Sequence, residues 1–150
     1  MRITEATLDD VEFISSYLEK HYIKLNNLVG YPKYRSEFEV MERNVRKRIK
    51  DESSLFKYFI ARDEHEQSLG FVNILLDINH PELLHLEVIP NANNKEEVAN
   101  LLLDTIYDKF RGIGVKNITT EVAKFNSIML ESLRGRGAVM SLISADLVIT

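Results

Sequence analysis

Two residues with acid–base chemistry, His85 and Glu87, stand two positions apart in the apolar run 83–89 (Leu-Leu-His-Leu-Glu-Val-Ile). Successive side chains of a strand point to opposite faces, so His85 and Glu87 should share one face. Leu84, Leu86 and Val88 should share the other face. An imidazole or carboxylate placed this way can accept a proton as a general base. The alternative interpretation is that both side chains simply face solvent or a neighbouring strand.

A helix start is predicted shortly after this run. Asn94 is a residue type that caps helices, and Glu97, three positions later, completes the pattern of a capping box. The exposed N–H groups and the positive dipole end of such a start can bind an anion. Because Glu96 and Glu97 place two carboxylates in the first turn, a well-capped helix without a ligand explains the same residues.

Composition excludes several other kinds of site. The 150-residue chain has no cysteine, which excludes disulfides, thiolate metal sites and cysteine nucleophiles. The spacing of His21, His65 and His80 is not that of metal ligands, so we expect no metal. A net charge of −4 argues against nucleic-acid binding, and the basic residues of 43–50 are expected to form a solvated helix face. No membrane helix or signal peptide is recognisable, so a cytoplasmic protein is expected.

Hydrophobic periodicity predicts a single α/β domain over residues 1–150. Strands are predicted at 2–6, 55–62, 69–78, 83–89, 115–122 and 138–149, and helices at about 11–22, 36–50, 94–112 and 126–133. The second and third strands should form an antiparallel hairpin around a polar turn. The strand–helix–strand order of the second half predicts a parallel pair. The predicted fold class is a mixed, mostly antiparallel central sheet with helices on both faces.

This order of elements resembles that of the GNAT superfamily of N-acetyltransferases over nearly the whole chain. Leu69-Gly70-Phe71 is similar to the family's third strand, and the segment that ends in Val88-Ile89-Pro90 is similar to its fourth, which commonly ends in Val-x-Pro. Leu101-Leu102 falls where the family has a Leu-Leu pair. Asn126 and Gly137 keep the spacing of the family's Asn…Gly-Phe segment.

The resemblance implies an acetyl-CoA-dependent N-acetyltransferase that acts on a small-molecule amine or a protein amino group. Acetyl-CoA would lie between the fourth and fifth strands, and Glu87 or His85 would be the general base. The cofactor-binding residues implied are Val88, Ile89, Pro90, Asn93, Asn94, Lys95, Val98 and Asn126. In such folds the segment that contains Tyr22, Tyr31 and Tyr34 lines the acceptor pocket, although tyrosines there more often serve packing.

Three positions depart from the family pattern. Glu96 and Val98 stand where the family's pyrophosphate loop has glycines, and Leu133 stands where a leaving-group tyrosine is expected. Carboxylates in this loop would repel a pyrophosphate. A GNAT-fold protein that has lost CoA binding, and works as a binding or dimerisation module, is therefore the second hypothesis. The apolar stretch at Val148 and Ile149 leaves open a homodimer that exchanges its last strand.

Overall fold

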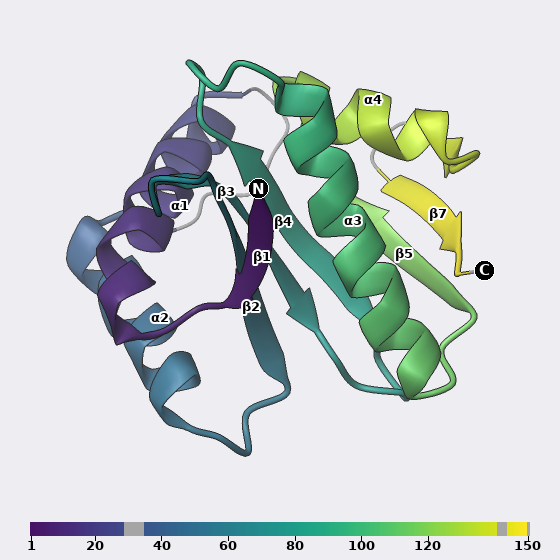
Figure 1. Ribbon diagram of the computed structural model, residues 1–150, viewed down its shortest axis with the longest axis horizontal. Helices are drawn as coiled ribbons and strands as arrows, with labels where there is room; N and C mark the ends of the chain where they lie inside the picture. Colours follow the sequence, from purple (N-terminus) through teal and green to yellow (C-terminus); the bar gives the residue numbers. More distant parts are fainter. Residues whose placement is uncertain (29–34, 141–143, 150) are drawn as a thin grey trace. The chain divides into compact units, whose positions relative to one another are not determined.

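The computed structural model describes residues 1–28, 35–140 and 144–149 (Figure 1). The chain forms two compact units. We call residues 6–54 the helical unit, and residues 1–5 together with 55–150 the sheet unit.

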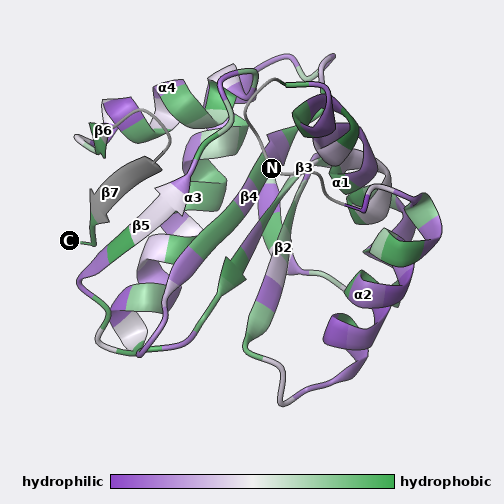
Figure 2. Ribbon diagram, turned by 180° about the vertical axis from the view of Figure 1, so that it is seen from behind, coloured by the Kyte–Doolittle hydropathy of each residue, from purple (hydrophilic) through white to green (hydrophobic). Residues whose placement is uncertain are grey.

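The helical unit contains a 3-10 turn, Leu8–Asp10, followed by α1 (Val11–Asn26) and α2 (Phe38–Lys50). The Asp10 carboxylate accepts a hydrogen bond from the Thr7 N–H at 2.8 Å and so forms part of the capping box of the 3-10 turn. The buried side chains of the two helices are Val11, Ile14, Ser15, Leu18, Leu25, Met41 and Val45. Both helices were predicted, and α2 begins two residues later than expected. The exposed side of α2 is strongly hydrophilic (Figure 2).

The sheet unit is built on a four-stranded antiparallel sheet in the order β1-β2-β3-β4. The strands are β1 (Arg2–Glu5), β2 (Phe56–Arg62), β3 (Ser68–Leu75) and β4 (Glu82–Val88). The predicted hairpin between β2 and β3 is confirmed, with Phe59 opposite Val72 and Ile60 opposite Phe71. The α/β class with a mostly antiparallel sheet, predicted from the sequence, is therefore confirmed, and the strand pairs in the described residues are antiparallel.

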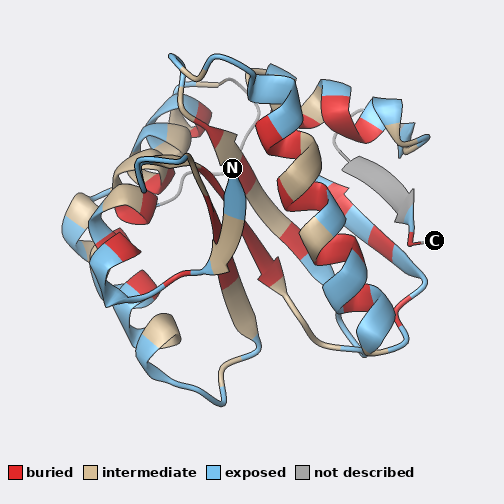
Figure 3. Ribbon diagram, viewed as in Figure 1, coloured by how far each residue is buried: buried red, intermediate tan, exposed pale blue. Residues whose placement is uncertain are grey.

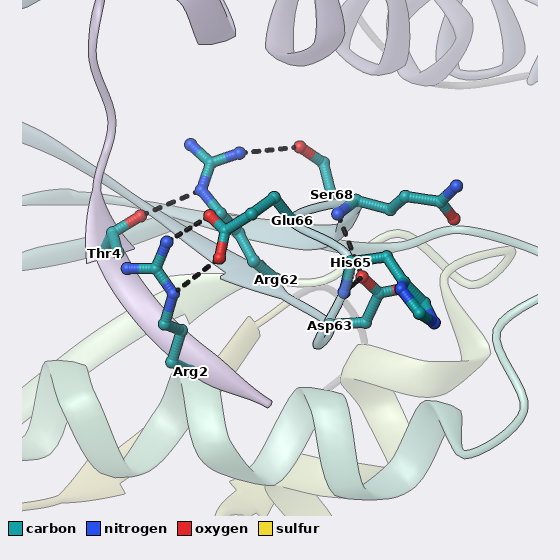
Figure 4. A network of polar contacts seen from close by, with 8 residues as sticks. Arg2, Thr4, Arg62, Asp63, His65, Glu66 and Ser68 are labelled. Carbon is teal, nitrogen blue, oxygen red and sulfur yellow. Dashed lines mark hydrogen bonds and ion pairs between the residues drawn. The ribbon is translucent and has the colours of Figure 1, made fainter.

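The turn between β2 and β3 is closed by side-chain contacts (Figure 4). The Asp63 carboxylate accepts hydrogen bonds from the backbone N–H groups of His65, at 2.8 Å, and Gln67, at 3.0 Å. An ion pair between Arg2 and Glu66 ties the turn to β1. These polar contacts hold the end of the hairpin, whereas residues in the middle of β3 are buried in the apolar core.

Helix α3 (Lys95–Gly112) covers one face of this sheet, and its buried residues recur along one side of the helix (Figure 3). Alternate residues of β2, β3 and β4 meet them, because strand side chains alternate between faces. The principal side chains of this core are Phe59, Ala61, Val72, Ile74, Leu83, Leu86, Val98, Leu102, Leu103, Ile106 and Phe110. Leu103 and Tyr107 of α3 are also buried, whereas Leu101 and Thr105 are only half-buried.

A second, three-stranded sheet follows, in the order β5-β7-β6. It contains β5 (Asn117–Glu121), β6 (Val139–Met140) and β7 (Ser144–Val148), and α4 (Ser127–Gly135) lies between β5 and β6 in the sequence. The single strand predicted over 138–149 is wrong, because this segment forms two antiparallel strands. The parallel ladder predicted between residues 83–89 and 115–122 is also absent from the described part of the chain, where β5 pairs with β7.

Candidate active site

Strand β4 has an open edge. In the described ranges β4 pairs with β3 and with no other strand. The N–H of Ile89 donates to the Leu69 carbonyl at 2.9 Å, so it points towards β3. Because neighbouring residues of a strand direct their N–H groups to opposite edges, the N–H of Val88 points to the unpaired side. This geometry provides a backbone hydrogen-bond donor at Val88, one of the residues that the family resemblance implies for cofactor binding.

Two side chains donate hydrogen bonds to β4 carbonyl groups on the same open edge. The Asn126 amide donates to the Leu86 carbonyl at 3.0 Å, and the Thr120 hydroxyl donates to the Leu83 carbonyl. Both side chains are buried. Side chains therefore satisfy acceptors that a neighbouring strand would otherwise satisfy with backbone N–H groups. Asn126, predicted as a cofactor contact, has a structural role here, because its carbonyl oxygen also accepts the Met129 N–H at the start of α4.

Gly70 sets the position of β4 on its other side. A Cβ atom at this position would lie 2.5 Å from the Glu87 carbonyl oxygen and 3.2 Å from Val88 Cα. It would also lie 3.4 Å from Val98 Cγ1 of α3. Only glycine therefore allows β3, β4 and the first turn of α3 to approach this closely.

The start of α3 is capped as predicted. The Asn94 carbonyl oxygen accepts the Glu97 N–H at 3.2 Å, and the Asn94 amide donates to the Glu97 carboxylate at 2.7 Å. The carboxylate thus bonds to the capping side chain. The N–H of Val98 donates to the Asn94 carbonyl at 3.1 Å, and the Val98 side chain is buried against the sheet. The backbone N–H groups of Lys95 and Glu96 lie in the first turn of α3, where no carbonyl group of the helix can accept from them. They can therefore donate to a ligand.

The other predicted cofactor residues lie in the loop between β4 and α3. Ile89 is half-buried, whereas Pro90, Asn93 and Lys95 are exposed. The Ala92 N–H donates to the Ile89 carbonyl at 3.2 Å, which turns the chain immediately after the strand. The predicted loop therefore begins directly after Val88, the last residue of β4.

His85 and Glu87 lie on the sheet face opposite the α3 core, and both are half-exposed. A register shift in the β3–β4 ladder, at Asn73/Ile74, leaves Leu84 as an extra residue of β4. Leu83, rather than Leu84, consequently joins Leu86 in the core. The predicted shared face of His85 and Glu87 is correct because the bulge lies before both residues.

Asn73 is a residue that sequence reasoning missed. It stands opposite His85 in the ladder, its side chain is 2% exposed, and its Oδ1 atom has no hydrogen-bond partner. An unpaired buried acceptor costs about 1–3 kcal/mol, so such groups are rare in folded proteins. The available signal was one amide inside the apolar run Phe71-Val72-Asn73-Ile74-Leu75.

Of the three tyrosines predicted for the acceptor pocket, one lies in the part of the chain that the structure describes. Tyr22 belongs to α1 of the helical unit, where its ring contacts the His21 ring edge-on at 5.2 Å between centroids. Tyr31 and Tyr34 lie outside the described residues. Within those residues, no group of three or more His, Asp or Glu side chains could hold a metal ion. None of the described helices is both long and apolar enough to cross a membrane.

Solved structures decide the fold. A structure described as a probable acetyltransferase superimposes with a TM-score of 0.69 at 19% identity, over 94% of this chain and 91% of its own. The PaiA N-acetyltransferase of Thermoplasma acidophilum, in complex with coenzyme A, gives 0.69 at 16% identity, over 97% and 95%. The spermidine N-acetyltransferase of Vibrio cholerae, in complex with CoA and spermine, gives 0.67 at 15% identity, over 99% and 95%. This chain has the GNAT fold.

The GNAT fold is supported here by structure alone. No family model matches the sequence, and no curated protein matches it either. The low identities mean that the arrangement of strands and helices is shared while most side chains differ. The residues of this chain must therefore carry any argument about its function.

Proposed function

We propose that the protein is an acetyl-CoA-dependent N-acetyltransferase that acts on a small amine. The observation that carries this proposal is the N–H of Val88, which points to the unpaired edge of β4. Acyl transfer requires a donor for the oxygen that gains negative charge in the transition state. A backbone N–H held by two neighbouring structural elements is preorganised for that task.

The proposed roles follow from these positions. Acetyl-CoA, when bound, supplies an acetyl group activated as a thioester. The Val88 N–H would bind the thioester carbonyl oxygen, and the N–H groups of Lys95 and Glu96 would bind the pyrophosphate. Glu87 or His85 would accept the proton that the amine loses as its nitrogen bonds to the acetyl carbon and the carbon–sulfur bond breaks. Leu133 has no ionisable proton, so the leaving thiolate must take its proton from another donor.

One observation favours a second candidate, a GNAT-fold module that does not bind CoA. The start of α3 is already capped by Asn94 and compensated by Glu96 and Glu97, so it offers an anion fewer donors and two repulsive charges. Val139 and Val148 are 69% and 62% exposed on the C-terminal sheet. In this second candidate they would contribute to a homodimer interface.

Thermal unfolding with acetyl-CoA separates the two candidates. A ligand at a hundred times its Kd stabilises the native state by about 2.7 kcal/mol. The enzyme hypothesis predicts a rise in melting temperature with acetyl-CoA, and the release of free thiol when an amine such as spermidine is then added. A protein that shows no shift at millimolar acetyl-CoA, and elutes as a dimer in light-scattering chromatography, matches the second candidate.

Val88→Pro tests the proposed donor directly. Proline removes the N–H of this residue, and the β3–β4 ladder does not use that group. We expect kcat to fall by roughly 100- to 1,000-fold, the usual effect of losing one such donor. Val88→Ala is the matched control, because it loses the same apolar side chain but keeps the N–H. Equal kcat values in the two variants would refute the assignment.

A further inference from the structure

A row of polar side chains crosses the middle of the sheet on the face opposite α3. Tyr58 of β2, Asn73 of β3 and His85 of β4 are register partners, so their side chains project from the same face. The next row towards the end of β4 contains Phe71 and Glu87. Tyr58 and Asn73 are buried, whereas His85 and Glu87 are half-exposed. The row therefore runs inward from the proposed base to the unpaired Asn73 amide.

The two buried asparagines of the sheet unit differ in how their amides are used. Both ends of the Asn126 amide are bonded, the nitrogen to the Leu86 carbonyl and the oxygen to the Met129 N–H. The Asn73 oxygen has no partner, although the residue is more deeply buried. Because buried polar atoms are normally hydrogen-bonded, the Asn73 oxygen is able to accept a hydrogen bond from a group outside the chain.

The neighbours of Asn73 indicate which kind of donor fits. Glu87 lies diagonally across the β3–β4 ladder, where Cα atoms are about 7–8 Å apart and longer side chains can converge on one atom. A carbonyl oxygen and a carboxylate are acceptors that suit a nitrogen with several hydrogens. We propose that Asn73 is a substrate-binding residue, whose Oδ1 accepts a hydrogen bond from the amino group of the acceptor amine. This proposal rests on the proposed function.

The amide would then hold the amine nitrogen while Glu87 or His85 removes its proton. Asn73 itself takes no part in proton transfer, since an amide oxygen is a hydrogen-bond acceptor and a very weak base. Its removal should therefore weaken amine binding and leave acetyl-CoA binding unchanged. Its replacement by an apolar residue of similar size should also remove the cost of the unpaired acceptor.

Asn73→Leu is the first test. We expect the melting temperature to be equal to or above that of the wild type, and the acetyl-CoA thermal shift to be unchanged. The KM for spermidine should rise about tenfold or more, because a hydrogen bond to a charged donor is lost. Ser132→Ala is the matched control, since Ser132 also carries a buried, unpaired oxygen but belongs to α4. This control should leave the KM unchanged.

The outcomes separate this inference from the proposed function. If acetyl-CoA binds to the wild type and to Asn73→Leu, but the KM for spermidine is the same in both, the role of Asn73 is refuted while the transferase remains. If acetyl-CoA binds to neither, the proposed function fails first. A large loss of stability in Asn73→Leu would show that the amide is bonded within the protein, which also overturns the inference.

A measurement on the unmodified protein covers the case in which the variant does not fold. The side-chain NH2 group of Asn73 gives a pair of resonances in a nitrogen–proton correlation spectrum. Spermidine added in the presence of CoA should shift this pair and leave the side-chain pair of Asn94 in place. Unmoved Asn73 resonances at a spermidine concentration that saturates the enzyme would refute the contact.

Discussion

Replacing Gly70 with alanine should destabilise the protein through backbone contacts. The added Cβ would meet the Glu87 carbonyl oxygen at 2.5 Å, whereas carbon–oxygen contacts of real Cβ atoms begin near 3.0 Å. The β4 backbone must therefore retreat by about 0.5 Å, and Val98 of α3 opposes part of this movement at 3.4 Å. Overpacking of this kind costs about 1–3 kcal/mol.

Urea unfolding followed by circular dichroism measures this effect. A loss of about 2 kcal/mol corresponds to a fall in melting temperature of roughly 4–8 °C for a chain of this size. The urea dependence of the unfolding free energy should stay the same, because the unfolded chain exposes nearly the same surface. Turnover should fall as well, because a movement of β4 displaces the Val88 N–H from its proposed position.

Gly112→Ala is the matched control for this change. A Cβ at Gly112, the last residue of α3, meets no atom within 4 Å. Alanine there should be neutral, or stabilising by up to about 1 kcal/mol, because it favours the helix. The reasoning is refuted if Gly70→Ala unfolds within 0.5 kcal/mol of the wild type, or if the two alanine variants lose equal stability.

Two further predictions concern the open edge of β4 and the pH dependence of stability. Asn126→Ala should lower the free energy of unfolding in urea by about 2–4 kcal/mol, because it removes a helix cap and leaves the Leu86 carbonyl unpaired. Asn94→Ala removes a helix cap alone and should cost only about 1 kcal/mol. Equal losses in the two variants would contradict a role of Asn126 in bonding the open edge of β4. Burial raises the pKa of Tyr107 above its ordinary value near 10. The folded state therefore retains this proton more strongly, and the stability of the wild type relative to Tyr107→Phe should be constant below pH 10 and fall as the pH rises above 10. Urea titrations from pH 8 to 11 measure the unfolding free energy of both proteins. A wild type that becomes more stable relative to Tyr107→Phe as the pH rises would contradict the predicted direction.

Local patterns in the sequence predicted the parts of the site that depend on neighbouring residues. Asn94 and Glu97 cap α3, and Asn126 caps α4, because a cap needs only the three residues that follow it. The shared face of His85 and Glu87 follows in the same way from strand alternation. These features require no knowledge of which strand lies beside which.

Features that depend on distant partners could not be obtained this way. The alignment of Asn73 with His85 depends on the β3–β4 register and on the bulge at Leu84, which no local pattern specifies. The division of residues 138–149 into β6 and β7 was missed because the segment contains no glycine or proline to indicate a turn. The proposed donor of Val88 was inferred from family resemblance, since a strand's sequence does not reveal whether its edge is paired.

The two side-chain bridges on β4 also bear on how this protein can change during evolution. A backbone ladder fixes the register of two strands along their whole length, whereas the Thr120 and Asn126 bridges join β4 at two carbonyl groups. Insertions or deletions within residues 117–149 can therefore alter the second sheet while β1 to β4 keep their pairing. Such changes are tolerated only where the two bridging side chains and the C-terminal residues of the shared core, such as Ile118 and Leu133, are kept.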